Sequence, residues 1–551
     1  MLTPLLRRAL LATTLSIVLS APDALAQKKT VCAITINSAD EKEVFRRSLP
    51  EAEFDFVELV EKGHPDWLES ACSKRVRCDV LLISGHFDDG TEFYSGRPDA
   101  PESLPVEEME RASCSSCELF SQLKEVYLFG CNTLDPRPLK SASPEIARSL
   151  VRSGYSQADA ERLSSQLAQV HAESNRDHMR QVFKDVPVIY GFSSKAPLGP
   201  AAGAMLSRYF QSASGNEIGT GEASGRLLKL FAPSSMTVAA GLRDSDAQAD
   251  YRRDVCHFAD DRLSPAEKAA FVHQLLHREA AEARMFLGYI EKYIASLNDE
   301  ARRTEDVSQA LSAIAADQPA REKFLTFARD ADDPAVRARM IAVARNLGWL
   351  SVSEQRAEWM AMIGEQLAQN AIRSADVDLA CTLNRDGSLG AYRDLRVSTA
   401  SNGAVPQAAM LACLGNETAQ ARIVHALSSP RDEDVQMAQV YLRHRPLAGT
   451  QELRDLTLAV AHMPGSDAQV RALNTLAGYP LSDRKSMEEL LSLFSATKMI
   501  EVQRAVAGIL IRADLSAMAG VELLKRIRQS RLKSADGEDM IDVLIRRLQR
   551  P

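Results

Sequence analysis

The sequence predicts an α/β domain with a mostly parallel sheet sandwiched by helices, followed by an all-α solenoid. Short apolar runs alternate with helical patterns over residues 27–242, and this alternation is typical of parallel sheets covered on both faces. Strand patterns cease beyond about Ser264, and similar helical segments then recur about every 33 residues, a period typical of stacked helical repeats. We expect a helical linker region over 243–300 and the solenoid over 301–551.

The five strands of the predicted sheet are continuous apolar or β-branched runs bounded by polar residues. Helical patterns separate them, including a long helical region over 143–184 and another helix after the last strand. In sheets of this kind, ligand sites form beyond the carboxyl ends of the strands. The predicted strands are 30–36, 54–60, 78–84, 125–130 and 186–192.

Length and charge restrict the function classes. The chain has 551 residues, which is more than one domain usually needs. Its apolar fraction of 45% and charged fraction of 25% are those of a globular protein. Because the net charge is −8 and no run of Lys or Arg dominates, the sequence predicts no nucleic-acid partner and no attraction to anionic lipid.

The N-terminus, residues 1–26, has the pattern of a secretory signal peptide. Arg7 and Arg8 precede an apolar segment over 9–20, and Ala24-Leu25-Ala26 fits the small-residue rule for a cleavage site. An uncleaved anchor is the alternative, but the apolar segment is too short to span a bilayer comfortably. We expect cleavage after Ala26, no membrane span in the mature chain, and a periplasmic or secreted bacterial protein.

The chain has nine cysteines, at positions 32, 72, 78, 114, 117, 131, 256, 381 and 413. In an oxidising compartment, an odd number leaves at least one thiol unpaired in a monomer. Cysteines that are close in the sequence predict structural disulfides. For the C-x-x-C pair Cys114–Cys117, the alternative is a redox-active dithiol. The pairs that sequence proximity suggests are Cys72–Cys78, Cys114–Cys117 and Cys381–Cys413.

Two of the predicted strands end in groups that suit nucleophilic catalysis. "DVLLISGH" ends in His86 and "EVYLFGC" ends in Cys131. Their separation allows one crossover helix, so the strands can be parallel neighbours whose carboxyl ends share one edge of the sheet. A histidine can take the proton of a thiol or stabilise the thiolate, which attacks carbonyl carbon. The sequence therefore predicts a His86–Cys131 dyad.

The paired Gly-His and Gly-Cys strand ends resemble the caspase-like cysteine peptidases over residues 29–235. The resemblance implies a caspase-like fold, with His86 as general acid/base and Cys131 as nucleophile. It also implies an oxyanion hole made of the Cys131 N–H and the N–H of the residue after the histidine. That residue is Phe87 here, where the family usually has a glycine.

The same resemblance implies that the strand after the cysteine lines the substrate pocket. Lys195 would favour an acidic substrate side chain, whereas the acidic pair near the histidine would favour a basic one. The pocket candidates are Phe192, Ser193, Ser194 and Lys195, together with Asp88 and Asp89.

The helical segments of the second domain resemble HEAT repeats. They share an outline in which a valine precedes apolar positions at helical spacing, at Val336, Val435, Val470 and Val502. An acidic-x-x-Val-Arg pattern occurs at Asp333–Arg337 and Asp467–Arg471, with an irregular helical bundle as the alternative. The resemblance implies a curved surface that binds protein.

We therefore predict an exported thiol protease that hydrolyses peptide bonds in protein or peptide substrates, with a protein partner on the solenoid. The sequence predicts no cofactor and no metal. The alternative is a catalytically inactive caspase-like scaffold that binds protein partners through both domains.

Overall fold

The structure is a computed structural model that divides into two compact units. The first comprises residues 1–144 and 162–271, and the second comprises 145–161 and 272–551. The predicted signal peptide lies outside the described residues. The structure describes residues 28–59, 68–87, 90–96, 101–138, 142–171, 173–212, 215–369, 372–389, 404–514, 520–533 and 539–549.

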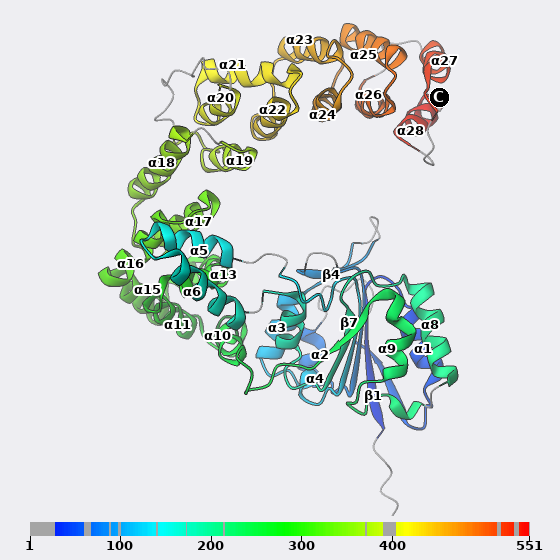
Figure 1. The fold of residues 1–551 in the computed structure, drawn as a ribbon, viewed down its shortest axis with the longest axis vertical. Coiled ribbons are helices and arrows are strands. Elements are labelled where there is room, and N and C mark those ends of the chain that lie inside the picture. The colour runs from blue at the N-terminus through cyan, green and yellow to red at the C-terminus, as the bar shows by residue number, and fades with distance from the viewer. Residues whose placement is uncertain are drawn as a thin grey trace, which may run out of the picture. The chain divides into compact units, whose positions relative to one another are not determined.

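A six-stranded sheet in the order β2-β1-β3-β6-β7-β8 forms the centre of the first unit (Figure 1). The strands are parallel up to β7, and β8 runs antiparallel to β7, which confirms the predicted mostly parallel sheet. The sequence did not predict β8 or a separate antiparallel pair, β4 (Glu92–Tyr94) and β5 (Ser103–Pro105). The central strands are β1 (Lys29–Thr35), β2 (Phe54–Glu58), β3 (Val80–Ser84), β6 (Glu125–Phe129), β7 (Val188–Phe192) and β8 (Met236–Ala239).

Helices cover both faces of this sheet, because alternate residues of each buried strand enter opposite cores. Val126 and Leu128 of β6 enter one core, whereas Tyr127 and Phe129 enter the other. Figure 1 shows the two helical layers on either side of the sheet. The first core is covered by α2 (Glu69–Ser73), α3 (Val106–Cys114), α4 (Glu118–Ser121) and α7 (Asn175–Val182), and the second by α1 (Asp40–Ser48), α8 (Gly199–Ser212) and α9 (Gly225–Phe231).

Four disulfides join eight of the nine cysteines, and their pairing corrects two expectations. Cys381–Cys413 is confirmed, whereas the predicted Cys72–Cys78 and Cys114–Cys117 bonds are wrong. Proximity in sequence was misleading, because the fold brings together cysteines from different elements. The observed bonds in the first unit are Cys32–Cys78, Cys72–Cys117 and Cys114–Cys256.

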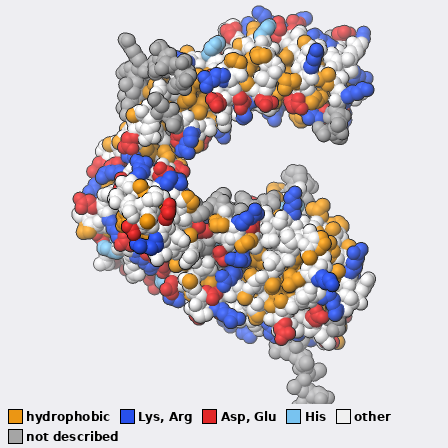
Figure 2. Space-filling view, in the orientation of Figure 1, with side chains coloured by type: hydrophobic (Ala, Val, Ile, Leu, Met, Phe, Trp, Pro, Cys, Tyr) orange, Lys and Arg blue, Asp and Glu red, His pale blue; other side chains and the backbone are white. Residues whose placement is uncertain are grey.

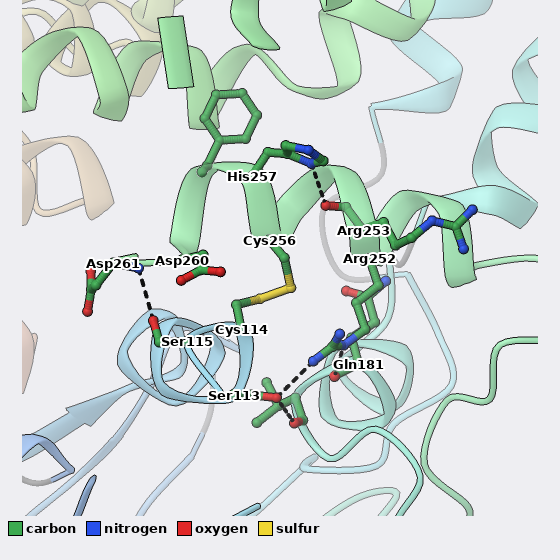
Figure 3. Close-up of a disulfide and its surroundings, with 12 residues drawn as sticks. Ser113, Cys114, Ser115, Gln181, Arg252, Arg253, Cys256, His257, Asp260 and Asp261 are labelled. Carbon is green, nitrogen blue, oxygen red and sulfur yellow. Dashed lines mark hydrogen bonds between the residues drawn. A yellow bond between two sulfur atoms is a disulfide. The ribbon is translucent and has the colours of Figure 1, made fainter. Parts of the chain in front are cut away.

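The Cys114–Cys256 bond ties α3 to α10 (Ala249–Ala259), which follows the sheet in the sequence (Figure 3). Polar contacts flank the bond on both sides. Arg252 donates to the Ser113 hydroxyl at 3.0 Å, and the Asp261 N–H donates to the Ser115 hydroxyl at 3.0 Å. Much of the region expected to be a linker, up to Phe271, is therefore part of the first unit.

All regular elements in the described part of the second unit are helices. Along its last part, α22, α24, α26 and α28 pack each against the next, and so do α23, α25 and α27 (Figure 1). The remaining helices are α5 (Ser143–Arg152), α6 (Gln157–Val170), α11 (Pro265–His277), α12 (Ala280–Met285), α13 (Leu287–Ser296), α14 (Asp299–Arg303), α15 (Glu305–Ala316), α16 (Gln318–Arg329), α17 (Pro334–Asn346), α18 (Val352–Ala368), α19 (Ser374–Leu383), α20 (Ala404–Cys413), α21 (Glu417–His425), α22 (Asp432–His444), α23 (Thr450–Ala461), α24 (Asp467–Leu476), α25 (Arg484–Ala496), α26 (Ile500–Arg512), α27 (Gly520–Ser530) and α28 (Met540–Gln549).

Two buried glutamines repeat the same contact in successive helix pairs. The Gln469 amide on α24 donates to the Val460 carbonyl of α23 at 3.0 Å. The Gln503 amide on α26 donates to the Phe494 carbonyl of α25 at 2.8 Å. Both side chains are fully buried, and each reaches back nine residues. The Gln503 amide thus supplies a donor to a carbonyl in the last turn of α25. The Gln469 amide adds a second donor to the Val460 carbonyl, which also accepts from the Met463 N–H at 3.2 Å.

The surface carries mixed charge. Figure 2 shows Lys and Arg side chains interspersed with Asp and Glu on the visible face of each unit. None of the helices among the described residues has the length and apolar character needed to cross a bilayer.

Candidate active site

Three adjacent parallel strands deliver polar side chains to one edge of the sheet. Thr35 of β1 pairs with Ser84 of β3, and Ser84 pairs with Phe129 of β6. Asn37, His86 and Cys131 each lie two residues beyond these paired positions. The strand register therefore aligns the three residues, and the expected meeting of His86 with Cys131 at one sheet edge is observed.

His86 and Cys131 line one narrow hollow, with a cavity volume of about 40 Å³. Asn37 lines it from the end of β1, and the segment 196–199 lines it from the loop between β7 and α8. This volume corresponds to little more than one water molecule. The reactive groups therefore lie in a tight hollow at the carboxyl edge of the sheet.

Asn37 fixes the orientation of the histidine ring. Its Oδ1 accepts a hydrogen bond from the Gly96 N–H at 3.2 Å, so its Nδ2 faces His86 Nε2 at 3.1 Å. In this arrangement Nε2 accepts, and the ring proton of neutral His86 is on Nδ1. The His86 ring also lies beside Tyr94, with centroids 5.4 Å apart. The sequence analysis did not single out Asn37, whose position beside His86 follows from the strand register.

Cys131 has the one free thiol among the nine cysteines, all of which the structure describes. It is partly buried, and its Sγ accepts a hydrogen bond from the Ala196 N–H at 3.3 Å. An N–H donor aimed at sulfur stabilises negative charge there. Among the described residues, the Cys131 N–H has no hydrogen-bond acceptor.

A tight turn follows Cys131 and is held from both sides. Asn132 has a φ of 60°, in the left-handed region that asparagine tolerates better than most residues. Its N–H donates to the Ser194 carbonyl at 2.7 Å, and its carbonyl accepts from the Asn175 amide at 2.9 Å. The turn therefore anchors the cysteine to the loop that follows β7.

The Phe87 side chain is part of the core rather than the hollow. It is fully buried, and its ring lies against Phe93 with centroids 4.6 Å apart. Consecutive residues of extended chain point to opposite sides, so His86 faces the hollow while Phe87 faces the core. The bulk of Phe87 consequently packs against Gly130 and does not fill the hollow.

A buried carboxyl group lies at the floor of the same hollow. Glu41 of α1 is almost fully buried and accepts a hydrogen bond from the Ser84 hydroxyl at 3.0 Å. Burial raises the pKa of Glu41, and the Ser84 hydroxyl opposes that rise. Glu41 is thus a third titratable group that lines the hollow, beside His86 and Cys131.

The predicted pocket residues have different positions. Phe192 is fully buried beside Phe129 and Phe231, whereas Ser194 and Lys195 are exposed and Ser193 is partly buried. The loop residues that line the hollow come immediately afterwards, from Ala196 to Gly199. The candidates Asp88 and Asp89 lie outside the described residues.

Comparisons of the chain with protein-family models, with curated proteins and with solved structures find no match.

Proposed function

We propose that the protein is an exported, caspase-like cysteine peptidase that cleaves peptide bonds through Cys131 and His86. The observation that carries the proposal is the free thiol. Eight cysteines are oxidised, while Cys131 stays unpaired in the same hollow as His86. Disulfides are typical of oxidising compartments, which supports a periplasmic or secreted location.

The chemistry uses each group in turn. Once the Asn37 amide has turned so that its Oδ1 accepts from Nε2–H, Nδ1 of His86 carries no proton and takes the proton of the Cys131 thiol, and the sulfur attacks the scissile carbonyl carbon. The Cys131 N–H, and by family resemblance the Phe87 N–H, donate to the oxyanion. When the C–N bond breaks, protonated His86 gives its proton to the leaving amine. Water then hydrolyses the acyl-thioester and releases the second product.

Asn37 acts as a positioning residue for His86 in this scheme. In the resting arrangement its amide donates to Nε2, which disfavours a proton there. Forming the imidazolium requires the amide to turn so that Oδ1 faces Nε2, at the cost of the hydrogen bond from the Gly96 N–H. A Cys–His–Asn arrangement is a known variant of the catalytic triad.

Repeated helices support a protein-binding role for the second unit. The two rows of packed helices and the recurring glutamine contacts favour a HEAT-like solenoid over an irregular bundle. Among the four valines of the repeat outline, Val435 and Val502 are fully buried, Val336 is nearly so and Val470 is partly buried, each early in its helix. We infer that this unit holds a protein substrate or partner.

A non-catalytic scaffold is the second candidate, and two observations favour it. The hollow that holds the dyad has a cavity volume of only about 40 Å³, which leaves little enclosed space beside the two reactive groups. The Asn37 amide also donates to His86 Nε2 in this arrangement, so that nitrogen is not free to accept the thiol proton. The scaffold would keep the fold and bind protein through the helical unit.

Thiol labelling separates the two candidates. Because the other eight cysteines are oxidised, iodoacetamide should label Cys131 alone in the unreduced mature protein. An ordinary thiol with a pKa of about 8.5 is only about 1% thiolate at pH 6.5. An activated Cys131 should therefore react at least tenfold faster than a free cysteine at that pH.

The variant His86→Ala should abolish this advantage, and His257→Ala is the matched control. His257 belongs to the same unit, and its exposed ring stacks on Phe271 away from the hollow. The parent protein should also cleave members of a peptide library, and Cys131→Ser should abolish this cleavage. Equal labelling rates in the parent and His86→Ala proteins, with no cleavage, would refute the peptidase and favour the scaffold.

A further inference from the structure

Two histidines and an aspartate converge in the second unit, in a cluster that the proposed function does not use. His273 and His277 lie one turn apart at the end of α11, and Asp317 directly precedes α16. Nε2 of each histidine lies 2.8 Å from the same oxygen, Asp317 Oδ2. The three potential ligand atoms all lie within 4.8 Å of one another.

The aspartate is oriented before any ligand arrives. Its Oδ1 accepts a hydrogen bond from the Ala320 N–H at 3.0 Å, which caps the start of α16. Oδ2 is then left to face the two imidazoles. Asp317 is well covered, with a side-chain exposure of 11%, so its carboxylate has little freedom to move.

We propose that His273, His277 and Asp317 bind one divalent cation of the zinc class. Two imidazole nitrogens and one carboxylate oxygen suit borderline transition ions, whereas Ca²⁺ and Mg²⁺ prefer sets made only of oxygen ligands. Bonds of about 2.0 Å in a tetrahedron separate neighbouring ligand atoms by about 3.3 Å. The two rings need to move outward by only about 0.5 Å from their present distances to the carboxylate.

The position on the helix also favours a cation. His277 is the last residue of α11, where the carbonyl end of the helix carries partial negative charge. The His277 side chain is 55% exposed, so the site opens to solvent on its side. Three protein ligands leave a fourth coordination position for water or an external group. The bound ion would tie the end of α11 to the start of α16.

Zinc binding to the full mature chain tests the proposal. The protein is stripped with a chelator, its Cys131 thiol is blocked with iodoacetamide, and Zn²⁺ is titrated by equilibrium dialysis with metal analysis. We expect saturation at one Zn²⁺ per chain and at least a tenfold loss of affinity in His277→Gln. No saturable binding, or equal affinity in the variant, would overturn the site.

His444→Gln is the matched control for the variant. His444 Nε2 also lies 2.8 Å from an oxygen of Asp378, but no second histidine in the described part of the chain shares this oxygen. This substitution should leave zinc affinity unchanged. An equal loss of affinity in His444→Gln would refute the assignment to the α11 cluster.

A second measurement needs no variant and so does not depend on its folding. Diethylpyrocarbonate modifies accessible imidazoles, and mass spectrometry reads each histidine separately. Zn²⁺ should slow modification of His277 several-fold and leave His444 unchanged, whereas Mg²⁺ should protect neither. If Zn²⁺ gives His277 no protection, the proposed site does not exist.

Discussion

Replacing Gly130 by alanine should disturb the candidate site through its packing. A Cβ at this position would lie 2.8 Å from Phe87 Cβ and 3.0 Å from the Gly85 carbonyl oxygen. These two residues flank His86 in the sequence. The new methyl group would therefore press on both neighbours of the histidine while being attached to the residue that precedes Cys131.

The size of the effect follows from these distances. Carbon atoms in favourable contact lie about 3.5–4.0 Å apart, so the Cβ–Cβ distance must increase by about 1 Å. Neither contact can be relieved by rotating a flexible side chain, because one partner is a Cβ atom and the other is backbone. Overpacking of this kind costs about 1–3 kcal/mol of unfolding free energy. A shift of about 1 Å between catalytic groups can cost about 100-fold in rate.

Two assays on the full mature chain measure these consequences. Hydrogen exchange read by mass spectrometry gives the opening free energy of peptides from β3 and β6, which we expect to fall by about 1–3 kcal/mol. The rate at which iodoacetamide labels Cys131 at pH 6.5, compared with the rate in His86→Ala, measures the enhancement by His86. We expect Gly130→Ala to reduce this enhancement at least tenfold. Gly225→Ala is the control, because a Cβ there meets nothing within 4 Å.

Unchanged exchange in β3 and β6 would refute the packing argument, since it would mean that Phe87 does not press on Gly130. Lower stability with unchanged labelling would instead mean that the spacing of His86 and Cys131 does not govern the thiol.

Two further predictions concern stability. Burial raises the pKa of Glu41, so the folded state holds its proton more tightly than the unfolded chain, and stability contributed by this group falls as pH rises above its ordinary value of 4.5. Glu41→Gln should therefore raise the melting temperature at pH 7 and have a smaller effect near pH 4; an equal effect at both values would contradict this reasoning. Joint replacement of Cys114 and Cys256 by alanine should cost the first unit about 2–5 kcal/mol, read by hydrogen exchange in α3 and α10, and unchanged exchange would show that the polar contacts around the bond suffice.

The sheet was predictable because its central strands are buried on both faces. All five residues of β3, β6 and β7 are buried, so each strand is a continuous apolar run in the sequence. β8 escaped prediction because it has only four residues, three of them partly exposed, and it lies at the sheet edge. A short edge strand carries neither a long apolar run nor clear alternation.

The candidate dyad was predictable from strand ends, but its third member was not recognised. His86 and Cys131 carry reactive groups, whereas Asn37 is an ordinary polar residue next to Ser38. Its importance comes from the register that aligns Thr35 with Ser84 and from the contact with His86. Register and strand order are tertiary properties, which the local pattern of one strand does not contain.

Side-chain direction and disulfide pairing were likewise beyond local sequence patterns. Phe87 follows His86 directly, yet the extended chain turns its ring into the core beside Phe93. Cys114 and Cys117 are close in sequence but bond to partners on α10 and α2. The pairing of these cysteines depends on how the helices pack over the sheet. Closeness in the sequence does not determine it.

The oxidised cysteines and the free thiol occupy different parts of the first unit. The Cys32–Cys78 bond joins β1 to a position two residues before β3, and the other two bonds join α2, α3 and α10 to neighbouring segments. Cys131 lies instead beyond the carboxyl end of β6, where the Ala196 N–H meets its sulfur. A disulfide requires Cα atoms about 4.4–6.8 Å apart, and each of the eight other cysteines already has a partner at such a distance. Cys131 is thus the one unpaired cysteine of the nine and shares a hollow with His86, as the proposed thiol nucleophile would require in an oxidising compartment.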